Sequence, residues 1–230
     1  MNDRFRSGFV SLVGRPNTGK STLLNALVGQ KVAIVADKPQ TTRTSIQGVV
    51  TRPEAQIVFV DTPGIHKADS PLNKRMMDTV RAALEERDLL LLVVDAARPF
   101  GEEDRRAVDL VRKSGTPVVL VLNKIDLLKE KARLLPLISQ YKEIHEFADY
   151  VPVSAVKGDG LEDLRQAILA RLPEGPAYFP EDYVTDQPER YLAAELIREK
   201  VLHATRKEVP HAVAVMVDKW EETPTITRIY

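Results

Sequence analysis

The chain of 230 residues contains no cysteine, which excludes disulfide bonds, thiol catalysis and cysteine-ligated metal sites and suits a reducing compartment. Basic and acidic residues number 33 each, so no net charge favours a polyanionic partner. The longest aliphatic run, Leu89 to Val94, is far shorter than the roughly 20 residues that a membrane-spanning helix needs. Met1 to Arg4 is not followed by an apolar stretch, so we predict no signal peptide. We expect a soluble, cytoplasmic protein, and nothing in the sequence supports peripheral membrane association.

Residues 1–172 alternate between short aliphatic runs and amphipathic stretches, which predicts an α/β fold with a mainly parallel sheet and flanking helices. The aliphatic runs end in polar residues, as expected of buried strands whose carboxyl ends face a ligand. The predicted strands are Phe9–Val13, Ile57–Val60, Leu89–Val94, Val118–Leu122 and Tyr150–Val153. The predicted helices are Lys20–Val28, Leu72–Glu86, Glu102–Lys113, Lys129–Phe147 and Leu161–Leu172.

A proline-rich segment, 173–188, then interrupts the pattern and is predicted to be a linker. The following stretch, 189–230, begins with an expected helix over Glu189–Lys207, with apolar residues at helical spacing: Ala194, Ile197, Val201 and Ala204. Two strands, Ala212–Val217 and Thr225–Tyr230, are predicted around a turn at Glu221–Pro224. Because the sequence stops inside the second of these strands, we expect 189–230 to be an incomplete second domain.

The segment Gly14-Arg15-Pro16-Asn17-Thr18-Gly19-Lys20-Ser21 matches the phosphate-loop pattern G-x-x-x-x-G-K-[ST] between a predicted strand and a predicted helix. Such a loop directs backbone N–H groups at phosphates, and its lysine supplies a point charge for the β- and γ-phosphates. The hydroxyl of Ser21 is a hard oxygen ligand suited to Mg²⁺. The nucleotide contacts expected here are Gly14, Asn17, Thr18, Gly19, Lys20, Ser21 and Thr22.

Two further segments are predicted to complete the phosphate side. Asp61-Thr62-Pro63-Gly64 ends a strand, so the Asp61 carboxylate can hold the metal and the Gly64 N–H can approach the γ-phosphate. A threonine in the loop 37–43 can complete the Mg²⁺ shell, with Thr42 preferred and Thr41 the alternative. The predicted metal ligands are therefore Ser21, Thr42 and Asp61, and the predicted catalytic residues are Lys20, Thr42 and Gly64.

The segment Asn123-Lys124-Ile125-Asp126 predicts recognition of guanine. The Asp126 carboxylate matches the N1–H and N2–H₂ donors of guanine, and adenine has no such donor pair. Asn123 can connect this segment to the phosphate loop, and the Lys124 stem can cover the base. From Ser154-Ala155, the Ala155 N–H is expected to meet the guanine O6. An ATP-dependent kinase is disfavoured because adenine would leave Asp126 unpaired.

The residue directly after Asp61-Thr62-Pro63-Gly64 is Ile65, whereas small GTPases place a water-orienting glutamine there. An isoleucine cannot orient water, so slow unassisted hydrolysis is expected. His66 lies beside this position and is interpreted as a bystander.

These motifs resemble the Era family of bacterial GTPases. The resemblance includes Gly14–Thr22, Pro39–Arg43 and Asp61–His66, and in the second domain it includes Thr185–Lys200 and Glu208–His211. It extends from about Phe9 to Tyr230 and implies a C-terminal KH-type RNA-binding domain. It also implies GTP hydrolysis coupled to binding of the 3′ region of small-subunit ribosomal RNA during ribosome assembly. In some relatives of the wider group, an asparagine at the position of Asn17 helps to bind K⁺, which would make K⁺ a cofactor beside Mg²⁺.

The second domain departs from this family in one respect. KH domains clamp RNA with a Gly-x-x-Gly loop, and none occurs after Pro180. Residues 181–230 carry 7 lysines and arginines against 10 aspartates and glutamates, a net charge of −3. The RNA partner is therefore implied by the resemblance and not by charge. The alternatives are a GTP-dependent protein-interaction switch and a related GTPase that acts in tRNA modification.

Overall fold

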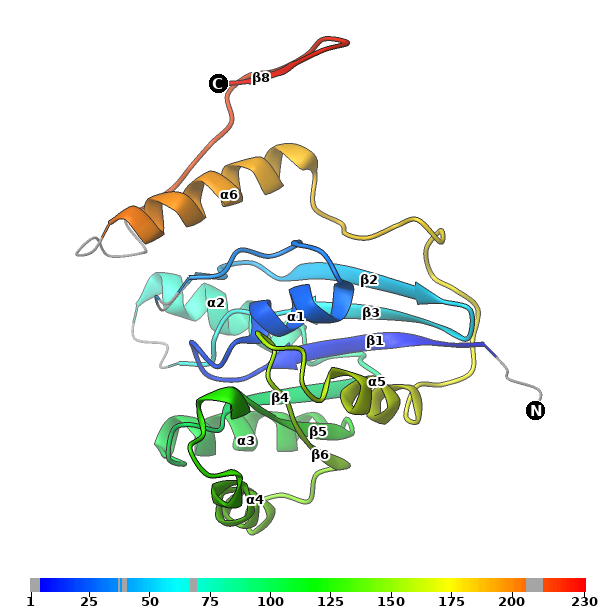
Figure 1. The fold of residues 1–230 in the computed structure, drawn as a ribbon, viewed down its shortest axis with the longest axis vertical. Helices are drawn as coiled ribbons and strands as arrows, with labels where there is room; N and C mark the ends of the chain where they lie inside the picture. The colour runs from blue at the N-terminus through cyan, green and yellow to red at the C-terminus, as the bar shows by residue number, and fades with distance from the viewer. Residues whose placement is uncertain (1–4, 37, 39–40, 67–69, 206–212) are drawn as a thin grey trace.

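A six-stranded sheet forms the centre of the molecule, and it is built from the aliphatic runs of the sequence (Figure 1). This computed structural model describes residues 5–36, 38, 41–66, 70–205 and 213–230. The strand order is β2-β3-β1-β4-β5-β6, with β2 antiparallel to β3 and all other neighbours parallel. The strands are β1 (Arg6–Val13), β2 (Ile46–Arg52), β3 (Ala55–Asp61), β4 (Leu89–Asp95), β5 (Val118–Asn123) and β6 (Asp149–Pro152).

Helices cover both faces of this sheet. One face packs against α1 (Lys20–Val28) and α5 (Leu161–Leu169), and the opposite face packs against α2 (Pro71–Ala82), α3 (Glu102–Ser114) and α4 (Leu134–Lys142). The strands β3 and β4 are buried along their whole length, which explains their continuous aliphatic character. The α/β architecture expected from the sequence is confirmed.

Several predicted boundaries differ from the structure. The helix expected over Lys129–Phe147 is reduced to α4, preceded by a 3₁₀ turn at Lys131–Arg133, because Pro136 is tolerated only in the first turn of a helix. The helix α2 ends at Ala82, and Glu86 beyond it has a positive φ of 52°, which is incompatible with a continued helix. The strand β2 was not predicted, because its period-2 pattern is weak and it forms the antiparallel edge of a largely parallel sheet.

The segment 173–188 runs back along the sheet and is bound to it. Backbone N–H groups of Ser7 and Val49 donate to Pro173 and Val184 carbonyls at 3.1 and 2.7 Å. The Gln56 amide group bonds the backbone of residues 178–179 at 2.7–2.9 Å. The predicted linker is therefore held by hydrogen bonds to β1, β3 and β2 in turn.

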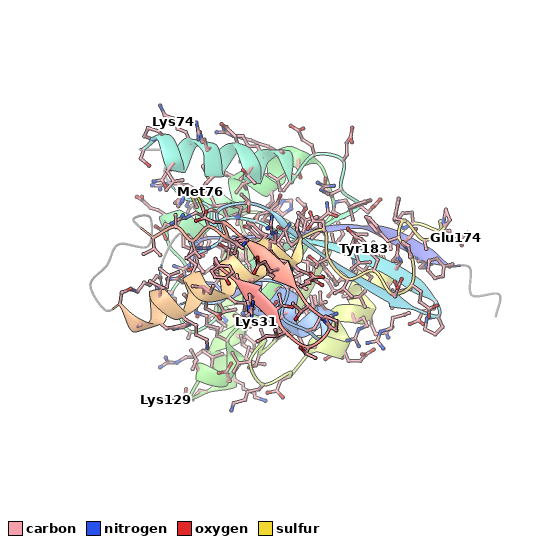
Figure 2. The ribbon with its side chains drawn as sticks, turned by 90° about the horizontal axis from the view of Figure 1, so that it is seen from above. Lys31, Lys74, Met76, Lys129, Glu174 and Tyr183 are labelled. Carbon is pink, nitrogen blue, oxygen red and sulfur yellow. The ribbon has the colours of Figure 1, made fainter. Side chains whose placement is uncertain are left out.

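A long helix, α6 (Glu189–Ala204), follows and crosses above the sheet near β2 (Figure 1). The hairpin of β7 (Trp220–Glu222) and β8 (Thr227–Ile229) lies beyond it, and Figure 2 looks down on α6 and this hairpin. The strand expected over Ala212–Val217 is wrong for its described part, since residues 213–217 pair with no strand. The turn lies at 223–226 rather than at 221–224, because Pro224 lacks an N–H for the ladder. Lys207, Ala212 and residues 208–211 lie outside the described residues.

The buried face of α6 also differs from the expected one. Ala194 is buried, but Ile197 is 45% exposed, Val201 is half-buried and Ala204 is exposed. The side chains that α6 buries most completely are Ala194, Arg198, Glu199 and Leu202. Two charged residues thus occupy the face that points at the α/β unit. No helix among the described residues is both long and apolar enough to cross a membrane.

Candidate nucleotide and magnesium site

The segments predicted to bind a nucleotide come together at the carboxyl ends of β1, β3 and β5. A hollow of about 320 Å³ lies there, and its walls come from the phosphate loop, the loop after α1 and the segments after β5 and β6. Of the predicted nucleotide contacts, Asn17, Gly19, Thr22, Asn123, Lys124 and Asp126 line this hollow. A second, adjoining hollow is lined by Lys20, Ser21 and Thr41 together with Asn17, Gly19 and Thr22. The topology therefore joins motifs that are distant in sequence into one concave surface.

The phosphate loop has the backbone geometry that its sequence predicts. Gly19 precedes α1 with φ of 90°, and a Cβ there would lie 2.4 Å from the Asn123 amide nitrogen, so only glycine fits. The Lys20 ammonium donates to the carbonyls of Gly14 and Arg15 at 3.3 and 3.1 Å, which points it back over the loop. Burial lowers the pKa of Lys20 to about 8, and the nearby charge of Asp61 opposes this shift. A phosphate placed in the loop would supply the charge that this buried ammonium needs.

Three oxygen-bearing side chains meet beside Lys20. The Ser21 hydroxyl donates to Asp61 Oδ2 at 2.5 Å and lies 2.9 Å from the Thr42 hydroxyl. Asp61 is fully buried, and its Oδ1 has no hydrogen-bond partner among the described residues. Burial raises the pKa of the Asp61 carboxyl, against the opposing effects of the Lys20 charge and the Ser21 hydroxyl. This all-oxygen set with one unsatisfied carboxylate oxygen suits a hard divalent cation.

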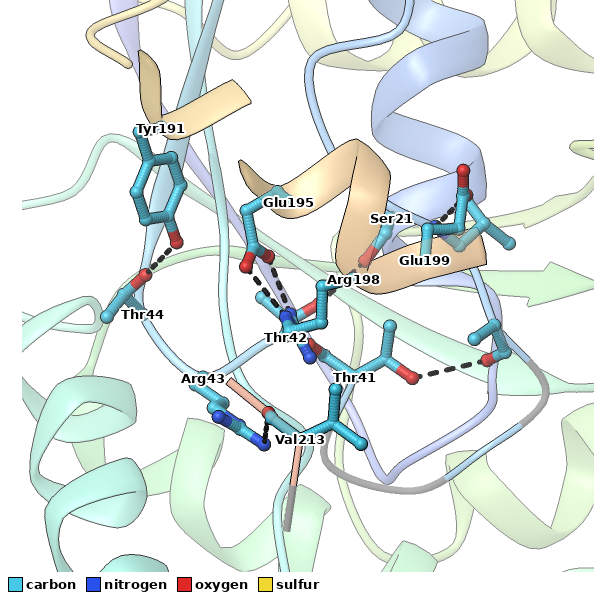
Figure 3. A network of polar contacts seen from close by, with 12 residues as sticks. Ser21, Thr41, Thr42, Arg43, Thr44, Tyr191, Glu195, Arg198, Glu199 and Val213 are labelled. Carbon is cyan, nitrogen blue, oxygen red and sulfur yellow. Dashed lines mark hydrogen bonds and ion pairs between the residues drawn. The ribbon is translucent and has the colours of Figure 1, made fainter. Parts of the chain in front are cut away.

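Of the two threonines considered as the metal ligand, Thr42 is the one that lies beside Ser21 in this structure. The Thr42 hydroxyl faces Ser21, whereas the Thr41 hydroxyl donates to the Lys38 carbonyl at 2.6 Å (Figure 3). Ile65 is 4% exposed and packs in the core on the α2 side, and its N–H donates to the Gly14 carbonyl at 2.9 Å. Its side chain is therefore directed into the protein interior and away from any water at the phosphate side.

The base side of the hollow is held together by Asn123. Its amide donates to the Thr18 carbonyl at 2.9 Å, and its Oδ1 accepts from the Ala155 N–H at 3.0 Å. One buried side chain thus joins the phosphate loop to the segment after β6. The bond to the phosphate loop agrees with the prediction from the sequence, and the bond to Ala155 was not predicted. Because Ala155 already donates to Asn123, its contact with the guanine O6 stays a prediction.

Asp126 presents its carboxylate to the hollow from an exposed position. The buried Ser154 hydroxyl donates to Asp126 Oδ1 at 2.6 Å, which orients the carboxylate while leaving acceptor positions open. Two apolar side chains, Leu127 and Val156, are 61% and 72% exposed and line the same hollow. Exposed aliphatic surface beside a carboxylate suits a flat base with polar edges.

Lys124 is fixed by a residue that the sequence did not single out. Its ammonium lies 2.9 Å from Asp95 Oδ2 at the end of β4 and donates to the Asn17 carbonyl at 2.6 Å. Asp95 directly follows the predicted strand Leu89–Val94. Its place at the carboxyl end of a strand is the signal that could have identified it as a site residue. Lys124 itself has a positive φ of 67°, which turns the chain into the 3₁₀ turn that carries Asp126.

A second unpredicted contact lies beneath the phosphate loop. The Arg15 guanidinium forms an ion pair with Asp104 at 3.1 Å, where Asp104 is buried at the start of α3 and also bonds the Gly101 N–H. Burial raises the pKa of the adjoining Tyr141, and the Asp104 charge adds to this shift. The phosphate loop is thus tied to the helix layer as well as to the sheet.

Comparisons with known proteins agree with this site. Residues 9–124 match the family described as 50S ribosome-binding GTPase. GTPase Era of Geobacter metallireducens is 52% identical over 95% of this chain and 73% of the relative, and GTPase Era of Syntrophus aciditrophicus is 50% identical over 95% and 71%. These relatives and the matched family are GTPases, and the chain is therefore a GTP hydrolase.

Solved structures are similar over nearly the whole chain. A structure of Era with MgGDPNP and nucleotides 1506–1542 of 16S ribosomal RNA has a TM-score of 0.91 at 42% identity, covering 96% of this chain and 75% of that one. An Aquifex aeolicus Era variant bound to GDP and aluminium fluoride gives the same values. The expected fold, a P-loop GTPase unit followed by an α+β KH-type segment, is confirmed. The chain belongs to the Era family of GTPases.

Proposed function

We propose that this GTPase is a nucleotide-controlled switch that binds the 3′ region of small-subunit ribosomal RNA and acts in assembly of the small ribosomal subunit. The observation that carries this proposal is the 42% identical Era structure that holds MgGDPNP and 16S RNA nucleotides 1506–1542 together. The two chains agree at a TM-score of 0.91 over both the α/β unit and the segment that follows it. The division into a GTPase domain (1–172), a connecting segment (173–188) and a KH-type domain (189–230) is part of this proposal.

The nucleotide is assigned to the residues that surround the two hollows. The phosphate loop and Lys20 bind the phosphates, and Asp126 recognises the guanine edge. Asn123 and Lys124 connect the base-binding segment to the phosphate loop. This assignment is supported by the bonds that join the motifs. The proposed nucleotide contacts are Gly14, Asn17, Thr18, Gly19, Lys20, Ser21, Thr22, Asp61, Gly64, Asn123, Lys124, Asp126, Ser154 and Ala155.

Mg²⁺ is assigned to Ser21, Thr42 and Asp61, whose oxygens converge. Bound there, it would bridge phosphate oxygens and neutralise charge that develops during phosphoryl transfer. Lys20 is assigned to stabilise the γ-phosphate oxygens, and the Gly64 N–H is assigned the same role. The attacking water has no side-chain partner at position 65, so turnover without a partner should be slow.

Potassium is a further proposed cofactor. Asn17 has a positive φ of 61°, and its carbonyl accepts from Lys124, so its backbone is already turned at the rim of the phosphate loop. If Asn17 helps to hold K⁺, replacing K⁺ by Na⁺ at constant ionic strength should slow GTP turnover while GDP affinity stays the same. Unchanged turnover would remove K⁺ from the proposal.

The test of the switch uses the protein expressed from its complete reading frame. Binding of an RNA with the small-subunit 3′-end sequence is measured with GTP analogue, with GDP and without nucleotide, against a scrambled RNA of equal length. We expect specific binding that is tightest with the GTP analogue, together with RNA-stimulated GTP turnover. Equal affinity for both RNAs, or affinity that ignores the nucleotide, would contradict the proposal.

The acidic balance of residues 181–230 supports a second candidate, a GTP-dependent protein-interaction switch. A net charge of −3 gives no electrostatic attraction to RNA over this segment. Recovery of a ribosomal or other protein partner with the GTP form alone, combined with RNA affinity that ignores the nucleotide, would favour this candidate.

A further inference from the structure

The loop between α1 and β2 carries Thr42, and its described residues 29–36, 38 and 41–45 contact α6 at several points (Figure 3). Each end of its described part is bonded to that helix. Lys31 and Val35 contact Glu199, and Thr44 contacts the Tyr191 hydroxyl at 3.0 Å. The loop therefore lies between the phosphate site and the first helix of the C-terminal segment.

Arg198 makes the contact nearest to the metal site. Its Nη2 donates to the Thr41 carbonyl at 2.6 Å, and the same guanidinium forms a two-point ion pair with Glu195 through bonds of 2.7 and 2.6 Å. Because the Thr41 carbonyl belongs to the peptide group that leads into Thr42, holding it restrains the orientation of Thr42. The Thr42 hydroxyl in turn lies 2.9 Å from Ser21.

Glu199, the next residue of α6, binds the first part of the loop. Its carboxylate accepts from the Val35 N–H at 2.8 Å and from the Lys31 ammonium at 2.5 Å. His203, one turn further on, lies 3.0 Å from the Val35 carbonyl. The loop is thus fixed by adjacent residues of a single helix at two points.

The burial pattern of α6 indicates that these contacts do more than pack the helix. The side chains of Arg198 and Glu199 are 3% and 4% exposed, whereas the apolar Leu196 and Ile197 beside them are 42% and 45% exposed. Burying a charge is unfavourable unless it is paired and hydrogen-bonded, and apolar side chains would pack a static interface at lower cost. Polar pairing with backbone groups is specific for one loop conformation, since the bonds exist only when the Thr41 and Val35 groups are in place.

We propose that α6 is a positioning element for the metal site, with Arg198 as the positioning residue that holds Thr42 beside Ser21 and Asp61. The inference rests on the proposed role of Thr42 as a magnesium ligand. A docked α6 stabilises the loop conformation that completes the metal shell, and withdrawal of α6 weakens it. By linkage, Mg²⁺ and the γ-phosphate stabilise the docked position of α6 to the same extent.

The test compares Arg198→Ala with Arg190→Ala, a matched control that removes an arginine from an exposed position of the same helix. GTP turnover is measured without RNA over a range of Mg²⁺ concentrations, and GDP affinity is measured in parallel. We expect Arg198→Ala to raise the Mg²⁺ concentration for half-maximal turnover by about tenfold while GDP affinity changes little. Arg190→Ala should match the parent protein.

Two outcomes would overturn the inference. One is the same Mg²⁺ dependence for Arg198→Ala and Arg190→Ala, and the other is an equal weakening of GDP and GTP binding, which indicates general damage. If Arg198→Ala does not fold, Glu195→Gln replaces it, because it loosens the guanidinium without removing it and should give a smaller shift in the same direction. Thr42→Ala separates the two proposals: no Mg²⁺ shift in Thr42→Ala refutes the metal assignment itself, whereas a shift there with none in Arg198→Ala refutes only the role of α6.

Discussion

The two halves of the nucleotide site are supported in different ways. On the base side, Asn123, Lys124 and Asp126 are held by bonds to the phosphate loop, to the end of β4 and to the segment after β6, all within the α/β unit. On the phosphate side, the loop carrying Thr42 is held by α6, which lies outside that unit in the sequence. Base recognition can therefore be rigid and independent, whereas the phosphate-sensing part depends on the position of a second segment.

This difference is what a molecular switch requires. The guanine contact must be the same with GTP and GDP, since it only selects the nucleotide. The γ-phosphate contact must exist in one state and be lost in the other, so its supporting groups must be able to separate. Contacts to a helix outside the sheet can separate and so meet this need, whereas contacts within a packed sheet do not.

The largest effect is expected on the base side, which is the rigid side of the site, from Asp126→Asn. The amide presents a donor to the guanine N1–H and N2–H₂ edge, so GTP and GDP affinity should each fall by about 10⁴-fold. Xanthine nucleotides should bind in their place, because their 2-oxo group accepts from the new amide. Isothermal titration with GTP, GDP and XTP measures this, and Asp163→Asn on the exposed face of α5 is the control. Retained GTP affinity would refute the base-reading role.

On the phosphate side, which is the switch side of the site, Gly64→Ala should reduce GTP turnover and leave GDP affinity nearly unchanged. A Cβ at Gly64 would lie 2.7 Å from the Pro16 backbone nitrogen, so residues 62–65 must shift away from the phosphate loop. The γ-phosphate contact would be lost, and GTP turnover should fall by about 10²-fold with GDP affinity nearly unchanged. Gly101→Ala is the control, because the nearest atom to its Cβ is 4.0 Å away. Equal loss of GTP turnover in both variants would contradict the assignment.

The sequence predicted the motifs on both sides of the site more completely than the contacts that support them. The motifs at 14–21, 61–64 and 123–126 each follow an aliphatic strand, so parallel-sheet topology places them together without any knowledge of side-chain packing. Asp95 was missed because a lone aspartate after a strand carries no motif, although its position matched the rule that identified Asn123. The sheet order and the antiparallel edge strand β2 depend on long-range pairing, which local pattern does not encode.

The position of helix α6 in the sequence was predicted, but the residues that it contacts were not predicted. Helical spacing of Ala194, Ile197 and Val201 suggested an apolar face, yet tertiary contact selected the face of Arg198 and Glu199. Their partners in the α1–β2 loop include the Thr41 carbonyl and the Val35 N–H, and such backbone partners cannot be identified from residue types. The role of α6 toward Thr42 therefore emerges only from the structure.

The smallest effect should come from Glu199→Gln, which tests the switch side alone. Burial by itself raises the pKa of Glu199, but bonds from Lys31 and the Val35 N–H hold it below its ordinary value. The charged carboxylate thus stabilises docking above the ordinary carboxyl pKa, and this contribution is lost as the pH falls through the lowered pKa. Removing the charge should weaken docking by about 1–2 kcal/mol near neutral pH.

Amide hydrogen exchange measures this change locally. Residues 31–36 and α6 should exchange about 5- to 30-fold faster in Glu199→Gln than in the parent, whereas β5 and the residues around Asp126 should be unaffected. Glu189→Gln, exposed on the same helix, is the matched control. Because protonation removes the same charge, the difference between parent and variant should shrink in acid. Faster exchange on both sides of the site would mean that α6 supports the whole α/β unit, and the distinction between a rigid base side and a dependent phosphate side would then fail.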